Sequence, residues 1–133
     1  MCGAIRYECS GPIESVALCH CESCRRVSGA HIVAWLTVRA DGLKFTQGPP
    51  REFASSAPVL RTFCAQCGTP LTYRHRDSPG SIDVTVATLD DPNSVAPEYH
   101  VWMEDAVRWE RGCDALPRYQ TSRAADASVK PTK

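Results

Sequence analysis

The stretch ALCHCESCRR, residues 17–26, places three cysteines and a histidine within six consecutive positions. Cys19 and Cys21 are separated by one residue, and Cys24 follows after two more. Such a cluster can form disulfides, a closed structural metal site, or a metal site with one position left open for chemistry. The rest of the chain bears on which of these three interpretations is favoured.

Length and charge restrict the class of protein. The chain has 133 residues, and 15 Lys and Arg balance 15 Asp and Glu, so the formal net charge is zero. A neutral chain lacks the basic excess that draws proteins to nucleic acids or anionic membranes, so we expect neither as a partner. The opening MCGAIRYECSG has no apolar signal-peptide region, and no apolar run reaches membrane-spanning length. The sequence therefore predicts a cytoplasmic protein.

The eight cysteines are the most informative part of the composition. In a reducing compartment they favour metal binding or catalysis over disulfides. Cys19 and Cys21, two residues apart, are poorly placed for a mutual disulfide but can share one metal ion. A disulfide scaffold is the less favoured alternative.

A second cysteine motif, FCAQCGTPL at residues 63–71, has the C-x-x-C-G pattern of a zinc knuckle. Cys64 and Cys67 can face one ion, and Gly68 permits the tight turn that directs backbone N–H groups at the sulfur atoms. With further cysteines in so short a chain, metal binding is favoured over a redox role for this pair.

The cysteines can be grouped in two ways. One zinc ribbon would combine two cysteines of the loop with the C-x-x-C pair, but it leaves several cysteines unexplained. Two ions are the better scheme: one held by the C-x-x-C pair and a ligand from the N-terminal strand, the other by Cys19, Cys21 and Cys24. The loop site has no evident fourth protein ligand, which is typical of a catalytic zinc site. His20 lies between two ligands, so we expect it to point away from the ion and to support the ligands or contact substrate.

Alternating and apolar segments predict a mainly β fold: a small single domain of short antiparallel strands stapled by zinc. One turn of helix is expected at residues 22–28, and no long amphipathic helix is evident. The domain is expected to span residues 1–120, with a disordered, small and polar tail at 121–133. The predicted strands are residues 3–9, 15–19, 31–38, 43–47, 59–64, 70–75 and 81–88.

Some conspicuous residues are expected to be structural rather than functional. The three tryptophans, Trp35, Trp102 and Trp109, are favoured as core residues over a substrate platform. His100 is favoured as a hydrogen-bonded structural histidine, and Cys113 as a spare thiol.

The two cysteine motifs carry a family resemblance. CHCESCRRVSG at residues 19–29 and FCAQCGTPL at residues 63–71 resemble the signature segments of the glutathione-dependent formaldehyde-activating enzyme (GFA) family. The similarity continues in CGAIRYE at residues 2–8, ATLDDP at residues 87–92, and PEYHVWMEDAVRWERGCDALPRY at residues 97–119. It therefore extends over nearly the whole predicted domain.

The resemblance implies a β-rich fold with two zinc sites. The catalytic ion would be held by Cys19, Cys21 and Cys24. The structural ligands would be Cys2, Cys64 and Cys67. One departure concerns the family's opening C-x-C-G, in which Cys2 takes the place of the second cysteine. The first would lie before residue 1, so we expect either a start placed too late or a structural site that lacks one ligand.

The resemblance also implies a carbon–sulfur lyase that condenses glutathione, or a related thiol, with formaldehyde or a similar small aldehyde. Arg25 and Arg26 can bind the carboxylates of such a thiol, or can equally pair with acidic side chains at the surface. Two alternatives stay open: a related enzyme for another thiol or aldehyde, and a non-catalytic zinc-binding module of the same fold. A fourth protein ligand on the loop ion would favour the module.

Overall fold

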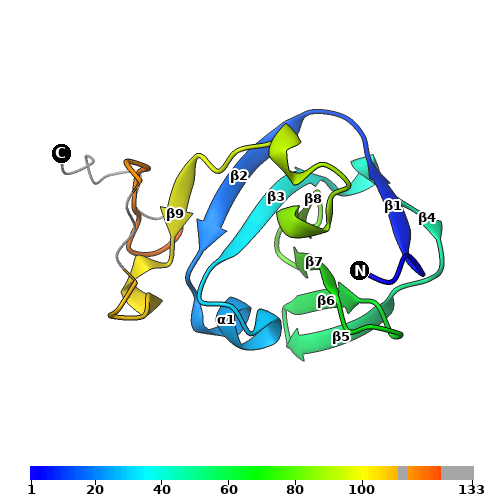
Figure 1. Cartoon of the computed structure of the whole chain (residues 1–133), viewed down its shortest axis with the longest axis horizontal. Helices are drawn as coiled ribbons and strands as arrows, with labels where there is room; N and C mark the ends of the chain where they lie inside the picture. Colours follow the sequence, from blue (N-terminus) through cyan, green and yellow to red (C-terminus); the bar gives the residue numbers. More distant parts are fainter. Residues whose placement is uncertain (111–113, 124–133) are drawn as a thin grey trace. The chain divides into compact units, whose positions relative to one another are not determined.

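The computed structural model describes residues 1–110 and 114–123, which form two compact units. The first unit consists of residues 1–15 and 36–94, and the second of residues 16–35 and the described residues from 95 to 123. Two strands, β2 (Ile13–Cys19) and β3 (Val33–Arg39), contribute residues to both units. The chain can be followed through these elements in Figure 1.

The first unit contains most of the strands. β1 pairs with β4 in an antiparallel two-stranded ribbon, and β5, β6, β7, β8 and β3 are neighbours in that order (Figure 1). The pairs β5–β6, β6–β7 and β7–β8 are antiparallel, as expected for strands joined by short turns. The bounds are β1 (Arg6–Cys9), β4 (Leu43–Gln47), β5 (Arg51–Ser56), β6 (Val59–Phe63), β7 (Pro70–His75) and β8 (Ser81–Thr85).

Burial along β1 follows the alternation that the sequence predicts. Along β1 the residues are alternately exposed and half-buried. The buried apolar side chains come from several strands and exclude water from the interior. A buried hydrogen bond of 2.7 Å joins the Thr62 and Thr72 hydroxyls of neighbouring strands, so their polar groups are satisfied. The buried aliphatic residues of this unit are Leu36, Val38, Leu71, Val84 and Val86.

The second unit is built on a parallel strand pair. β2 pairs with β9 (Tyr99–Val101) so that Cys19 lies opposite Val101. The helix α1 (Glu22–Ser28) lies between β2 and β3 in the chain. The residues after Pro117 continue the hydrogen bonding at β9, where Tyr119 N–H donates to the His100 carbonyl. The buried apolar residues of this unit include Val16, Ala17, Val33, Trp35 and Tyr99.

The prediction of a mainly β fold is confirmed, and α1 has the predicted bounds. The strands β5 and β9 were not predicted, and the parallel pairing of β2 with β9 departs from an all-antiparallel arrangement. The described residues also form four short 3₁₀ helices: η1 (Ala40–Gly42), η2 (Val86–Thr88), η3 (Pro92–Ser94) and η4 (Met103–Asp105).

The structure describes only part of the C-terminal segment for which predictions were made. Cys113 and most of the tail predicted at 121–133 lie outside the described residues. The single-domain boundary near residue 120 stays a prediction.

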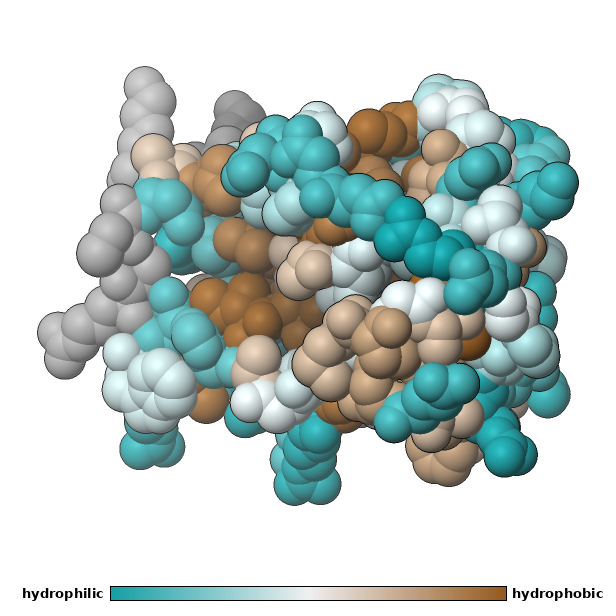
Figure 2. Space-filling model, turned by 45° about the vertical axis from the view of Figure 1, so that its right-hand side comes forward, coloured by the Kyte–Doolittle hydropathy of each residue, from teal (hydrophilic) through white to brown (hydrophobic). Residues whose placement is uncertain are grey.

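The core assignment of the tryptophans is correct for Trp35 but wrong for the other two. Trp109 is 66% exposed and packs against the His31 ring, and Trp102 is 38% exposed. Figure 2 shows that other hydrophobic residues also reach the surface on one face of the molecule. No helix in the described part of the chain is long and apolar enough to cross a membrane.

Gly48 permits a close backbone approach that matters for the N-terminal segment. Its φ is +72°, and a Cβ there would lie 2.8 Å from the Ala4 carbonyl oxygen. We expect Gly48→Ala to destabilise the protein by about 1–3 kcal/mol, because it adds left-handed strain and displaces the segment that carries Cys2. Urea unfolding followed by tryptophan fluorescence measures this change.

Gly80→Ala is the matched control, since a Cβ at Gly80 meets no atom within 4 Å. Its free energy of unfolding should stay within about 0.5 kcal/mol of the parent. Equal effects of the two substitutions would contradict the proposed constraint.

Candidate metal centres

The three cysteines of the loop lie where β2 ends and α1 begins. Cys19 is the last residue of β2, and Cys21 is the N-cap of α1. The Sγ of Cys21 accepts a hydrogen bond of 3.3 Å from the Cys24 backbone N–H. This bond satisfies one of the unpaired donors at the start of the helix, so the helix start fixes two cysteines relative to each other.

Local sequence explains why α1 is so short. Glu22 lies in the first turn and Arg25 and Arg26 in the last, which suits the helix dipole. The helix stops at Gly29, whose φ of 67° lets its N–H donate back to the Arg25 carbonyl. The Ser28 hydroxyl donates to the Cys24 carbonyl at 2.7 Å, which closes the last turn.

These elements bring three sulfur atoms together. The Sγ atoms of Cys19, Cys21 and Cys24 all lie within 4.8 Å of one another. Cys19 and Cys24 are buried, whereas Cys21 is half-buried. Hydrogen bonds with Cys21 and Cys24, followed by burial, raise the pKa of Cys19 far above its usual value. Three such thiols cannot all ionise unless a positive charge is placed among them.

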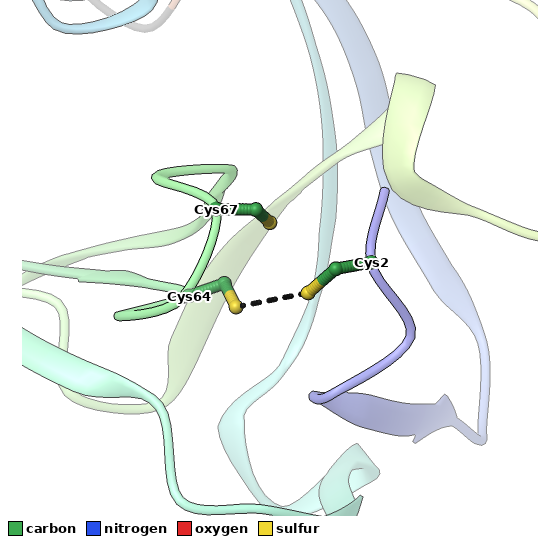
Figure 3. Close-up of side chains that lie close together, drawn as sticks. All are labelled: Cys2, Cys64 and Cys67. Atoms are coloured by element: carbon green, nitrogen blue, oxygen red, sulfur yellow. Dashed lines mark hydrogen bonds between the residues drawn. The ribbon is translucent and has the colours of Figure 1, made fainter.

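The second group joins the C-x-x-C motif to the start of the chain. Figure 3 shows Cys2, Cys64 and Cys67 pointing toward one another. The Sγ atoms of Cys2 and Cys64, 62 positions apart, are separated by 3.6 Å. A disulfide would need about 2.05 Å, so these two are thiols in contact. The centre therefore ties the N-terminus to the turn after β6.

The turn that presents Cys64 and Cys67 has the geometry predicted for a knuckle. Gly68 has a φ of +74°, and its N–H donates to the Cys64 carbonyl at 2.8 Å. The Cys64 N–H donates to the Thr69 carbonyl at 2.9 Å. Only glycine adopts this conformation without strain, so the motif's glycine is required for the turn.

The acidities of the thiols in this group differ. The Thr69 side chain, 3.1 Å from Cys67 Sγ, is the main reason that the pKa of Cys67 is lowered to about 6. The Ala4 backbone lowers the pKa of Cys2, but hydrogen bonds with Cys67 and Cys64 outweigh it, and the net shift is upward. A readily ionised Cys67 beside two further cysteine sulfur atoms is a suitable set of donors for a divalent ion.

Both groups fit a tetrahedral metal ion such as zinc. With Zn–S bonds of about 2.3 Å, the sulfur atoms of a tetrahedral site are about 3.8 Å apart. The 3.6 Å between Cys2 and Cys64 and the spacing below 4.8 Å elsewhere agree with this value. In the described residues, no fourth Cys, His, Asp or Glu atom joins either group at that spacing.

A chain of polar side chains lies behind the loop. His20 is fully buried, and its Nε2 is 2.8 Å from Nδ1 of His100, which is also buried. The Nε2 of His100 is 3.1 Å from a carboxylate oxygen of Asp114. Burial, and then the nearby His100, lower the pKa of His20. As expected, His20 belongs to neither group of possible metal ligands, and His100 is a buried, hydrogen-bonded histidine.

Arg25 and Arg26 make different contacts. The Nε of Arg25 donates to the His20 carbonyl at 3.2 Å. Arg26 forms a 2.7 Å ion pair with Glu22 on the exposed face of α1. The second arginine thus has the surface pairing that was one of the two predicted alternatives, and a role of either in ligand binding stays a prediction.

The sequence was compared with known families and structures. A family model described as "Glutathione-dependent formaldehyde-activating enzyme" matches residues 1–105. The chain belongs to this family. The matched region of this GFA-family protein includes all six grouped cysteines, but it ends before Asp114.

One solved structure supports the fold. A crystal structure of a Rhodobacter sphaeroides protein has a TM-score of 0.58 and 24% sequence identity, covering 70% of this chain and 88% of that chain. At this identity the similarity concerns the fold alone. No curated protein matches the chain to a significant degree.

The structure thus brings together all six cysteines predicted as ligands, in the predicted two groups. No sequence pattern pointed to Asp114, which lies 14 positions from His100 and contacts it in the folded chain.

The two groups predict two metal ions per chain. Protein purified without chelators and supplied with zinc should contain close to two ions by elemental analysis, because the sulfur atoms form two separate groups. Binding should release protons, since most of the thiols must ionise. A firm value of one ion, insensitive to added zinc, would contradict the two-centre arrangement.

The two centres should differ in their effect on stability. Cys64→Ser removes a ligand that closes a long loop, so the thermal midpoint should fall by roughly 10 °C or more. Cys21→Ser should lower it by only a few degrees, roughly 5 °C at most, because serine is a good N-cap and the loop is local. Thermal melts of the zinc-loaded proteins, monitored by circular dichroism, test this difference. Equal losses would mean that the centres are not divided into a stabilising and a local one.

Proposed function

We propose that this GFA-family protein is a zinc-dependent carbon–sulfur lyase that condenses glutathione, or a related thiol, with formaldehyde or a similar small aldehyde. Family membership supports a glutathione-dependent, formaldehyde-activating or related function. The observation that carries the proposal is the group of Cys19, Cys21 and Cys24, a local three-thiol centre with no fourth ligand in the described residues. We propose zinc at both centres and catalysis at this one.

The chemistry requires a thiolate beside a small aldehyde. The sulfur of the thiol bonds to the carbonyl carbon, the C=O electron pair moves to oxygen, and that oxygen takes a proton. A free thiol with a pKa near 8.5 is only a few per cent ionised at pH 7. A zinc ion supplies the positive charge that ionises a coordinating thiol.

The burial of the three cysteines supports this proposal. The buried Cys19 and Cys24 hold the inner side of the centre, whereas the half-buried Cys21 leaves access from solvent. Three thiolates already give the centre a net charge near −1, which weakens Lewis acidity, so positioning is expected to contribute more than polarisation. A reducing compartment such as the cytoplasm is part of the proposal, because oxidation would remove the thiolates.

Arg25 and Arg26 are proposed to bind the carboxylates of the thiol substrate. Both follow Cys24 directly, so they lie close to the proposed centre in the chain. The ion pair of Arg26 with Glu22 is exposed on both sides, and such pairs contribute little, so a ligand carboxylate can replace Glu22. Arg25, held at Nε by the His20 carbonyl, would be oriented by the loop itself.

Glutathione binding tests this function directly. Glutathione should bind the zinc-loaded protein with release of a proton, because its thiol must ionise to reach the metal. Affinity should rise with pH up to the pKa of the free thiol and then level off, since the proton to be displaced is no longer there. Calorimetry in two buffers of different ionisation enthalpy measures both effects.

S-methylglutathione is the matched control ligand, since it keeps both carboxylates but cannot supply a thiolate. It should bind at least roughly tenfold more weakly, which corresponds to about 1.4 kcal/mol. Equal affinities without proton release would favour a non-catalytic zinc module. NMR exchange spectroscopy of glutathione and formaldehyde, with and without the protein, then tests whether the condensation itself is accelerated.

A further inference from the structure

The side chains behind the loop form a hydrogen-bonded chain. The ionised Asp114 carboxylate only accepts, so His100 donates to it from Nε2. In a neutral ring the other nitrogen of His100 then accepts, and His20 donates to it from Nε2. The Nδ1 of His20 has no hydrogen-bond partner in the described residues.

The backbone of His20 is held by hydrogen bonds as well as its ring. Its backbone N–H donates to the Val101 carbonyl at 3.1 Å, and its carbonyl accepts from Arg25 Nε at 3.2 Å. His20, which lies between two proposed ligands, is therefore held by its backbone N–H, its backbone carbonyl and its side chain. Since Cys19 and Cys21 are its direct neighbours, their backbone positions depend on these contacts.

We propose that the chain Asp114–His100–His20 is a positioning device for the Cys19/Cys21/Cys24 centre. It holds the loop in the metal-binding arrangement before the ion arrives, so less ordering is needed on binding. Side chains behind metal ligands commonly act in this way, and their loss costs roughly 10–100-fold in metal affinity. The inference rests on the metal centre of the proposed function, and not on the reaction.

Two substitutions test the chain at its two ends. His20→Ala removes the donor to His100 and should weaken metal binding at the loop centre by roughly 10–100-fold. Asp114→Asn removes the charge that orients His100 and should weaken metal binding at the loop centre by at least roughly threefold. Binding at Cys2, Cys64 and Cys67 should not change in either variant.

The measurement is NMR of the cadmium-loaded full-length protein, in which each sulfur-rich centre gives its own signal. The loop signal is assigned by its loss in Cys21→Ser. Affinities follow from competition with a chelator, and the loop signal should also shift or broaden in both test variants, because its ligands are less fixed. A purely structural role would lower thermal stability without selective change at this centre.

Rescue and control variants complete the test. His20→Gln has an N–H donor near the position of the histidine Nε2, so it should restore affinity to within roughly threefold of the parent. Asp77→Asn is the matched control, since the Asp77 carboxylate lies at the surface, 3.7 Å from His75 Nδ1, in the other unit. It should leave the loop signal unchanged.

Each outcome distinguishes the inference from the proposed function. A parent protein without a loop signal would overturn the metal centre itself. A loop signal of unchanged affinity and shift in both His20→Ala and Asp114→Asn would overturn the positioning role alone. If His20→Ala fails to fold, Asp114→Asn decides the question, because its half-exposed side chain can change with little effect on packing.

Discussion

Repulsion between closely spaced thiolates is the constraint on which the rest of the structure depends. Each unit gathers three sulfur atoms within 4.8 Å of one another. In the loop this proximity raises the pKa of Cys19, which disfavours its ionised form in the absence of a cation. A divalent ion reverses the balance, because its charge favours the ionised form of every ligand. The folded chain thus provides two sets of closely spaced sulfur donors that become strong ligands when a metal ion is present.

The two centres differ in how far apart their cysteines lie in the sequence. Cys2 and Cys64 are far apart in the sequence, so an ion between them closes a long loop and its binding free energy contributes to folding. Cys19, Cys21 and Cys24 lie within one short segment, where an ion restrains few further residues. The second arrangement leaves a metal able to exchange ligands without unfolding the chain. This difference is the physical reason for proposing chemistry at the loop and stabilisation at the knuckle.

Local patterns were sufficient to predict much of this molecule from its sequence. Cysteine spacing identified both groups, alternation identified β1, and the polar segment at residues 22–28 identified α1. The strand β5 was missed because every residue in it is exposed, and β9 because it has only three residues and depends on β2. Asp114 was missed for the same reason: its contact with His100 exists only after distant segments meet. Exposure of Trp109 likewise follows from tertiary packing, which residue type alone does not specify.

The loop also needs support that its own sequence does not supply. A helix as short as α1, seven residues, is unstable in isolation, and one N-cap bond to Cys21 does not change that. Its shape must therefore come from tertiary contacts, and the β2–β9 pairing and the buried His20–His100 contact hold the chain just before it. These contacts bury a ring nitrogen of His20 without a hydrogen-bond partner in the described residues, which is unfavourable on its own. An apolar side chain would fill the same space without this loss of free energy. The presence of His20 beside the proposed ligands therefore supports its proposed role in holding their positions.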